Sequence, residues 1–266
     1  MLAEQYLREG DLAKALAELQ KQVRENPANP KLRVFLFQLL AVLGQWDRAQ
    51  TQLKLAGDLD AANLLMAQTY REAMLCEALR AEVFAGRRTP LVFGDPQHWL
   101  ALLLEALRLD GLGHAAAAQD LRGQAFADAP ATPGTFNGAA FEWIADADSR
   151  LGPVLEAIVN GRYYWFPFQQ IQSITLEAPA DLRDVVWTPA EFVWANGGGA
   201  SGLIPTRYSG TEASTDALLQ LARKTEWQEF FAGAYQGTGQ RLLATNVGDY
   251  ALMDARAIQF GQAEAP

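Results

Sequence analysis

The first half of the chain carries apolar residues at the spacing of amphipathic α-helices. The clearest run follows the pattern i, i+3, i+4, i+7 and i+11, and it consists of Leu12, Ala15, Leu16, Leu19 and Val23. This spacing places all five side chains on one face of a helix. Asn-Pro pairs at residues 26–27 and 29–30 interrupt the chain after this run. Further helices are expected over residues 31–43, 61–84, 96–109 and 114–127, so the first half is predicted to be entirely helical.

These helices contain an internal repeat of 34 residues. Three residue pairs stand one period apart: Gly10 and Gly44, Ala15 and Ala49, and Leu19 and Leu53. A third copy is blurred, but Gly113 lies 103 residues after Gly10, which is three periods plus one residue. This period is that of tetratricopeptide-type helix pairs, in which glycine stands where two helices turn. We therefore expect such repeats up to about residue 130, with a plain helical bundle as the alternative.

The predicted helix over residues 31–43 is apolar on two faces. One stripe consists of Leu32, Phe35, Leu36, Leu39, Leu40 and Leu43, and the second consists of Val34, Phe37 and Ala41. In helix-pair repeats the first helix of each pair lines a concave surface that usually holds a peptide. We therefore interpret the second stripe as peptide-binding residues, with a fully buried central helix as the alternative. Residues 61–75 and 96–108 are the other places from which a groove could be lined.

After residue 161 the pattern changes to short aromatic and β-branched runs bounded by proline and glycine. These runs predict strands at residues 162–166, 171–176, 192–194, 202–204, 241–245 and 250–253. The intervening loops at 196–199 and 246–249 predict antiparallel hairpins. A helix is expected between residues 215 and 223. The second half is thus predicted to be a small, mostly antiparallel sheet with short helices.

A turn-rich segment at residues 129–138 marks the expected boundary between the two halves. We predict a tetratricopeptide-like helical domain over residues 1–130 and a linker with short helices over residues 131–160. An α+β domain is predicted over residues 161–266. The fold class predicted from the sequence is therefore α+β, with helical repeats followed by a sheet.

Composition and charge narrow the classes of partner. The chain has 266 residues and a formal net charge of −9, with −2 on residues 1–134 and −7 on residues 135–266. This balance argues against a nucleic acid or an anionic membrane as partner, because both require a basic face. The single cysteine, Cys76, excludes an intrachain disulfide and suits a reducing cytosol. Neither a signal peptide nor a membrane-spanning run is visible, so a cytoplasmic protein is expected.

No motif for catalysis, cofactor binding or metal binding is complete. His98 and His114 lie 16 residues apart, without the spacing of metal ligands. Residues 146–150 begin like a calcium loop, but Arg150 stands where a third oxygen ligand belongs. The glycines at 197–199 precede a strand, whereas a phosphate-binding loop opens a helix. We therefore assign no catalytic, cofactor-binding or metal-binding residue and expect a non-enzymatic protein.

Five segments resemble the ImpE/TagJ family, and together they span essentially the whole chain. They are residues 33–40 (RVFLFQLL), 44–49 (GQWDRA), 161–168 (GRYYWFPF), 181–190 (DLRDVVWTPA) and 203–208 (LIPTRY). Members of this family are cytoplasmic accessory proteins of bacterial type VI secretion systems without known enzymatic activity. The resemblance implies binding to a helical segment of the small contractile-sheath subunit. It also implies a link to the AAA+ ATPase that disassembles contracted sheaths, and it supplies no catalytic residues.

Two other classes of function stay open at this stage. One is a hydrolase or transferase with its site between the two domains, which would need titratable side chains converging in a cleft. The other is a scaffold that only oligomerises through exposed aromatic residues. An adaptor would instead need an apolar groove with a polar rim.

Overall fold

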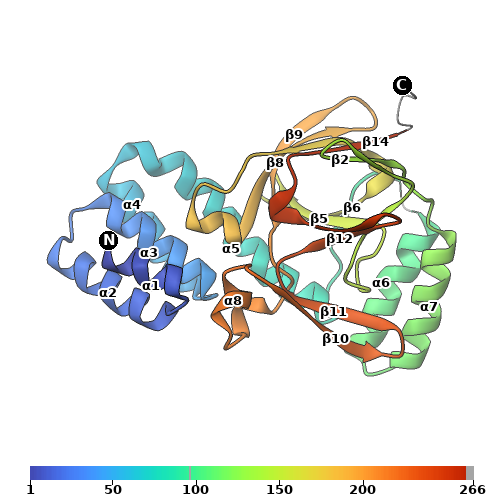
Figure 1. Ribbon diagram of the computed structural model, residues 1–266, viewed down its shortest axis with the longest axis horizontal. Helices are drawn as coiled ribbons and strands as arrows, with labels where there is room; N and C mark the ends of the chain where they lie inside the picture. The colour runs from blue at the N-terminus through green and yellow to red at the C-terminus, as the bar shows by residue number, and fades with distance from the viewer. Residues whose placement is uncertain (96, 262–266) are drawn as a thin grey trace.

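The structure is a computed structural model that describes residues 1–95 and 97–261 (Figure 1). The helices of the first half are α1 (Leu2–Glu9), α2 (Leu12–Glu25), α3 (Pro30–Val42), α4 (Trp46–Leu59), α5 (Leu64–Phe84), α6 (His98–Gly111) and α7 (Ala115–Asp128). The start predicted for α6 falls on Pro96, and the end predicted for the second domain falls on residues 262–266. Both lie outside the described residues.

The first four helices form two antiparallel pairs, as the 34-residue period predicts. Gly10 and Gly44 stand at the turns with φ angles of 79° and 65°, a left-handed conformation that glycine adopts without steric cost. The side chain of Asp11 caps α2 by accepting a hydrogen bond from the Lys14 backbone N–H at 2.9 Å. Asn29 caps α3 in the same way, and Pro30 occupies the first turn of that helix.

The remaining helices do not continue this stack. Figure 1 shows α1–α4 at one end of the molecule and the α6–α7 hairpin at the other, with α5 running between them against the sheet. Gly113 lies between α6 and α7 with a φ of 80°, so the residue predicted as a repeat turn does stand at a turn between two helices. The hairpin that it joins packs at the opposite end of the molecule from the first two pairs.

Among the described residues, the strands form three sheets, and all but one of these strands lie in the second half. Their bounds are β1 (Leu91–Val92), β2 (Gly134–Phe136), β3 (Ala139–Phe141), β4 (Ile144–Asp146), β5 (Val154–Val159), β6 (Arg162–Pro167), β7 (Ile171–Leu176), β8 (Trp187–Trp194), β9 (Gly199–Pro205), β10 (Thr225–Phe231), β11 (Ala234–Gly239), β12 (Leu242–Thr245), β13 (Gly248–Ala251) and β14 (Ala257–Phe260). The largest sheet has the order β1-β6-β5-β9-β8-β7-β14-β2-β3, and β10-β11 and β13-β12-β4 form the other two. Every described pairing is antiparallel except that of β1 with β6.

Two expectations for the middle of the chain are wrong. The segment predicted as a linker with short helices, residues 131–160, contains the strands β2, β3, β4 and β5 instead. In β5 all six residues are buried, and a short buried run cannot be assigned to helix or strand by periodicity. In addition, β1 lies inside the half predicted to be entirely helical.

Two hydrophobic clusters cover the two faces of the large sheet. The first joins the sheet to α1–α6 and includes Trp165, Trp187 and Leu203. The second contains the stacked rings of Phe166, Phe192 and Trp194 together with Ile258. A short helix, α8 (Ala217–Gln220), and the 3-10 turn η3 (Leu182–Val185) lie outside the sheet. The turn η3 packs against α3 and so brings the second half onto the repeats.

Candidate partner-binding surface

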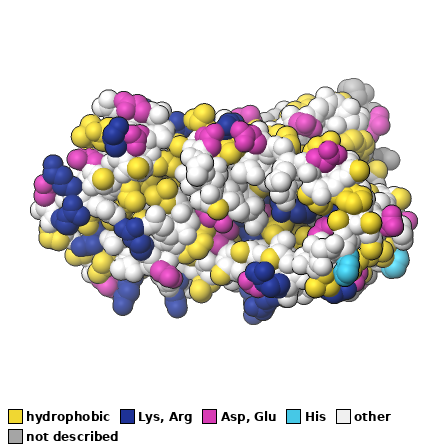
Figure 2. Space-filling model, turned by 90° about the horizontal axis from the view of Figure 1, so that it is seen from below, with side chains coloured by type: hydrophobic (Ala, Val, Ile, Leu, Met, Phe, Trp, Pro, Cys, Tyr) yellow, Lys and Arg dark blue, Asp and Glu magenta, His cyan; other side chains and the backbone are white. Residues whose placement is uncertain are grey.

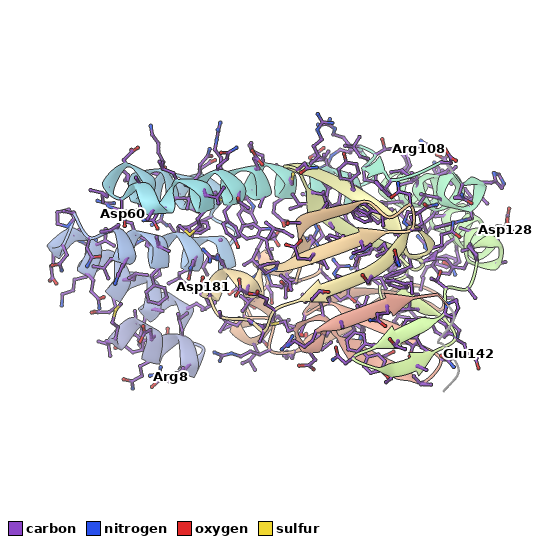
Figure 3. All side chains as sticks on the ribbon, turned by 90° about the horizontal axis from the view of Figure 1, so that it is seen from above. Arg8, Asp60, Arg108, Asp128, Glu142 and Asp181 are labelled. Atoms are coloured by element: carbon purple, nitrogen blue, oxygen red, sulfur yellow. The ribbon has the colours of Figure 1, made fainter. Side chains whose placement is uncertain are left out.

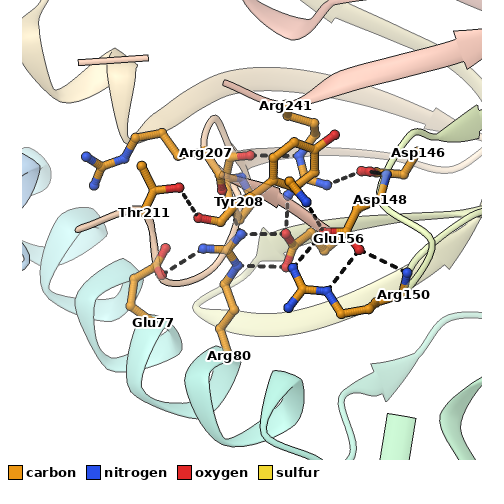
Figure 4. A network of polar contacts seen from close by, with 12 residues as sticks. Glu77, Arg80, Asp146, Asp148, Arg150, Glu156, Arg207, Tyr208, Thr211 and Arg241 are labelled. Atoms are coloured by element: carbon orange, nitrogen blue, oxygen red, sulfur yellow. Dashed lines mark hydrogen bonds and ion pairs between the residues drawn. The ribbon is translucent and has the colours of Figure 1, made fainter. Parts of the chain in front are cut away.

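A buried network of charged side chains joins α5 to the sheet (Figure 4). Arg80 of α5 donates two hydrogen bonds to the carboxylate of Glu156 on β5, at 2.8 and 2.6 Å. Arg241 donates to both Glu156 and Asp146, and the Tyr163 hydroxyl donates to Glu156 at 2.6 Å. Burial alone would raise the pKa of Glu156, but Arg80 and Arg241 outweigh it and lower the value to about 2.

The same network reaches the helical repeats. Glu77 accepts hydrogen bonds from Trp187 Nε1 at 2.9 Å and from Arg80 at 3.2 Å. Arg207, which follows β9, donates to the backbone carbonyl of Val42 at the end of α3, at 2.9 Å. Buried charges are stable only when they are paired in this way. The network therefore fastens the two halves of the chain together.

The burial of this network bears on whether the junction between the two halves could be a catalytic site. Titratable groups do converge there, as a catalytic site would require. Yet each of these side chains is at most 8% exposed: Glu77, Arg80, Asp146, Glu156 and Arg241. A substrate must reach the groups that act on it. The arrangement therefore fits a structural role better than a catalytic one.

The predicted peptide-binding residues are mostly inside the protein. Phe37 and Ala41 are both fully buried, and the Phe37 ring lies 5.7 Å from the ring of Tyr70 on α5. Only Val34 reaches the surface, at a cleft of about 500 Å³ between α1, α3 and residues 180–182. The interpretation of Phe37 and Ala41 as groove residues is wrong, and the alternative of a buried central helix applies to them.

The reason is that the chain covers its own concave surface. The segment 180–187 lies over α3 and α5, and the Trp187 ring is 5.8 Å from Trp46 and 5.6 Å from Tyr70. The Asp184 side chain fixes the start of this segment by accepting hydrogen bonds from the backbone N–H groups of residues 180 and 181, both at 2.8 Å. The signal in the sequence was the pattern of apolar residues in 182–187, but only the structure shows that they pack against α3.

An open groove lies instead between α4 and α5. It has a volume of about 810 Å³ and is lined by Asp47, Gln50, Thr51, Leu53, Lys54, Gly57, Asp58, Leu64, Ala67, Gln68, Arg71 and Glu72. At Gly57 the two helices approach closely, because a Cβ there would stand 3.3 Å from Leu64 Cδ2. Residues 64–72 belong to the helix that the sequence offered as an alternative groove wall.

This groove has an apolar floor and a polar rim. Leu64 and Ala67 of α5 and Leu53 of α4 supply the apolar part, and both acidic and basic side chains stand along the edges. Leu59, Leu64 and Leu65 are exposed by 43%, 56% and 77% around the turn from α4 to α5. Figure 3 marks this end of the molecule by Asp60. Such a surface suits the apolar face of an amphipathic helix.

The described residues offer no metal site of the usual kind. Among residues 1–95 and 97–261 there is no group of three or more His, Cys, Asp or Glu side chains that could hold a metal ion. His98 and His114 are both exposed, and Figure 2 shows the two histidine side chains in cyan on the surface at the α6–α7 end. In the same part of the chain, no helix combines the length and hydrophobicity needed to cross a bilayer.

Comparison with known proteins agrees with this architecture. A family model described as ImpE protein matches residues 138–259, and a tetratricopeptide repeat model matches residues 6–69. The latter match and the helices to residue 128 confirm the predicted fold class, repeats followed by a mostly antiparallel sheet.

Two individual proteins are similar over the full length. The type VI secretion system accessory component TagJ of Pseudomonas aeruginosa is 55% identical over 265 residues, which cover 100% of this chain and 93% of that protein. A crystal structure of a Vibrio parahaemolyticus protein superposes with a TM-score of 0.88 and covers 99% of both chains. Its sequence is 22% identical, so this second likeness concerns the fold alone.

Proposed function

The chain belongs to the ImpE/TagJ family, and from that membership we propose that it is a non-enzymatic accessory protein of a type VI secretion system. The proposal is supported by the Pseudomonas aeruginosa relative, a type VI secretion system accessory component that is 55% identical across the whole chain. Tetratricopeptide-like repeats, which commonly bind proteins, support a protein as partner. A cytoplasmic location and a link to the AAA+ ATPase of the system are part of the proposal and rest on the family resemblance.

The partner we propose is a helical segment of the small contractile-sheath subunit, bound in the groove between α4 and α5. In a tetratricopeptide array the second helix of each pair packs on the first helix and on the preceding pair. The helix α5 has the position of the first helix of a third pair. The chain then continues into β1, and α6 packs at the other end of the molecule.

The groove between α4 and α5 is thus the place of a missing second helix, and this is the observation that carries the proposal. A partner helix lying there would bury Leu64 and Ala67 against its apolar face. Its polar face would meet the mixed charges of the rim, which include Lys54, Arg71 and Glu72. A helix that completes a repeat gains the packing that the repeat otherwise lacks.

A hydrolase or transferase is the weaker alternative. Its site between the two halves would have to use the buried network, or the cleft of about 370 Å³ between α5 and the sheet. In that cleft the Ser201 hydroxyl donates to Glu191 at 2.9 Å, but its lining contains neither histidine nor lysine. A serine nucleophile needs a neighbouring base of that kind.

Titration calorimetry of the full-length protein against synthetic peptides tests this function. The peptides would cover the helical segments of the small sheath subunit one by one. One peptide should bind, and Leu64→Asp should weaken its binding at least about tenfold, because a carboxylate would face the apolar side of the helix.

The matched control is Leu112→Asp. Leu112 is 58% exposed, close to the 56% of Leu64, and it lies at the end of α6. Binding that is unaffected by Leu64→Asp, or lost equally in Leu112→Asp, would remove the groove from the proposal. Absence of binding by every peptide would reject the sheath subunit as the partner.

A further inference from the structure

A second apolar cleft lies between the end of α7 and the three-stranded sheet. It has a volume of about 390 Å³ and is lined by Phe126, Ala129, Pro130, Ala131, Trp143, Ile144, Ala145, Asp146, Ala147, Ser149, Gly152, Pro153 and Ala244. Phe126 and Trp143 are 40% and 39% exposed, although large aromatic side chains are usually more buried. Figure 3 marks this end of the molecule by Asp128 and Glu142.

The position of Phe126 depends on one glycine. A Cβ at Gly152 would stand 2.4 Å from Cε1 of Phe126, so the ring lies directly against the backbone at that point. Gly152 also has a φ of 55°, which other residues adopt at a cost. The ring is therefore held at the cleft by a backbone feature and does not simply project into solvent.

One wall of the cleft is the edge of a sheet. β4 is the outer strand in the order β13-β12-β4, and its residues 144–146 all line the cleft. The Asp146 N–H, which points away from β12, donates to the carbonyl of Gly152 at 2.6 Å. The outer edge of β4 is therefore already bonded within the chain at Asp146, and Ile144 is the strand residue whose outward backbone faces the cleft. An extended segment can add to a strand edge at such a point.

Three acidic residues stand next to lining residues of the cleft, in sequence or in register. Asp128 and Glu142 each neighbour a lining residue in the sequence, and Asp249 is paired in register with the lining residue Ala244. All three are exposed, and within the described residues none of them takes part in a salt bridge. The basic residue next to the lining in the sequence is Arg150, which follows Ser149 and is paired with Asp148 at 2.6 Å.

We propose that this cleft binds an extended protein segment that places an apolar side chain between Phe126 and Trp143 and carries lysine or arginine on either side of it. The aromatic walls supply the apolar contact, the β4 edge favours an extended backbone, and the carboxylates select for positive charge. This site is separate from the groove between α4 and α5 and does not depend on the sheath subunit. It gives the protein a second, chemically different binding surface.

Calorimetry with defined probes tests this proposal. One probe is a short synthetic peptide that alternates lysine with valine and leucine, and the other has glutamate in place of each lysine. The basic peptide should bind the full-length protein and the acidic peptide should not. Raising the salt from about 50 mM to about 500 mM should weaken binding, because exposed charges are screened.

Matched variants locate the binding. Trp143→Ala and Phe126→Ala should each weaken it about tenfold, and Glu142→Lys should weaken it several-fold. The controls are Trp227→Ala, at a tryptophan of 40% exposure on β10, and Glu25→Lys, at an exposed carboxylate of α2. Both controls should bind as the unaltered protein does.

Three results would overturn the proposal. They are equal binding of the two peptides, no binding of the basic peptide, and a loss in the controls as large as in the cleft variants. The last result would indicate attraction to the overall negative charge. Phe126 belongs to α7 and Trp143 to the loop between β3 and β4, and both are partly exposed. A folding defect in one variant therefore leaves the other to decide.

Discussion

Arg80 and Glu156 are 76 residues apart in the chain and form a buried pair with two hydrogen bonds, one from each of two guanidinium nitrogens. A pair of this kind contributes little net stability, but removing one member leaves an uncompensated charge in the interior. Arg80→Leu should therefore lower the free energy of unfolding by about 3–5 kcal/mol. Chemical denaturation measures this change. Arg87→Ala, which removes an exposed pair with Glu82, should leave the midpoint unchanged, and equal effects in both variants would contradict the assignment.

Stability should fall in acid through Glu156. The folded-state pKa of this carboxyl is about 2 and its usual value is 4.5. A carboxylate with a lowered pKa stabilises the folded state above its usual pKa, and this contribution is lost as the pH falls from about 4.5 to about 2. The shift corresponds to about 3 kcal/mol. Denaturation curves recorded across this range should lose much of their pH dependence in Glu156→Gln, which will be less stable at neutral pH. If the free energy of unfolding of this variant still fell as steeply between pH 4.5 and about pH 2, the effect would belong to other carboxylates.

Phe37 should behave as a core residue. Its ring is fully buried beside Tyr70, so Phe37→Ala should cost about 3–5 kcal/mol through lost contacts and a cavity. Val34→Ala, at the half-buried neighbour on the same helix, should cost much less. Thermal unfolding followed by circular dichroism compares the two. A Phe37→Ala protein that melts like the unaltered one would restore the groove interpretation.

The two turn glycines should differ in their tolerance of a methyl group. Both glycines have a positive φ, which alanine adopts at a cost. Gly10→Ala should therefore lower the free energy of unfolding by about 1 kcal/mol. Gly44→Ala should cost more, since its Cβ would stand 2.6 Å from the side chain of Glu212 in the second half. Adding Glu212→Gly, which removes both the Cγ at 2.6 Å and the Cβ at 2.7 Å from the added methyl group, should recover part of the loss in Gly44→Ala and none in Gly10→Ala. A double-variant cycle from chemical denaturation gives this coupling, and strict additivity would mean that the contact is unimportant.

The sequence predicted what depends on local periodicity. The helix that begins at Leu12 follows from a one-faced apolar stripe, and the strand over residues 162–167 follows from its aromatic texture. β5 could not be predicted because all six of its residues, including the charged Glu156, are buried, and a short buried run has no helix or strand periodicity. The partners that neutralise this carboxylate, Arg80 and Arg241, lie 76 and 85 residues away. Pairings over such distances leave no periodic signal in the sequence.

The candidate surface was harder to predict for the same reason. Two apolar stripes on α3 indicated a helix in contact with something on both sides, but not what that contact was. In the structure, residues 180–187 of the same chain cover one side of α3. Phe37 is therefore buried and does not line a groove. The open groove formed where α5 lacks a following helix, and that absence becomes visible only when α6 is seen to pack elsewhere.

The helix α5 has a mechanical consequence. One end, near Ala67, lines the open groove, and the other, near Arg80, is anchored in the interior of the sheet. At 1.5 Å per residue these points are about 20 Å apart along a single unbroken helix. A segment bound in the groove would thus have a fixed orientation relative to the sheet, because a rigid helix and not a flexible linker joins the two. The protein would then act as a spacer, fixing both the distance and the angle between what it holds at its two ends.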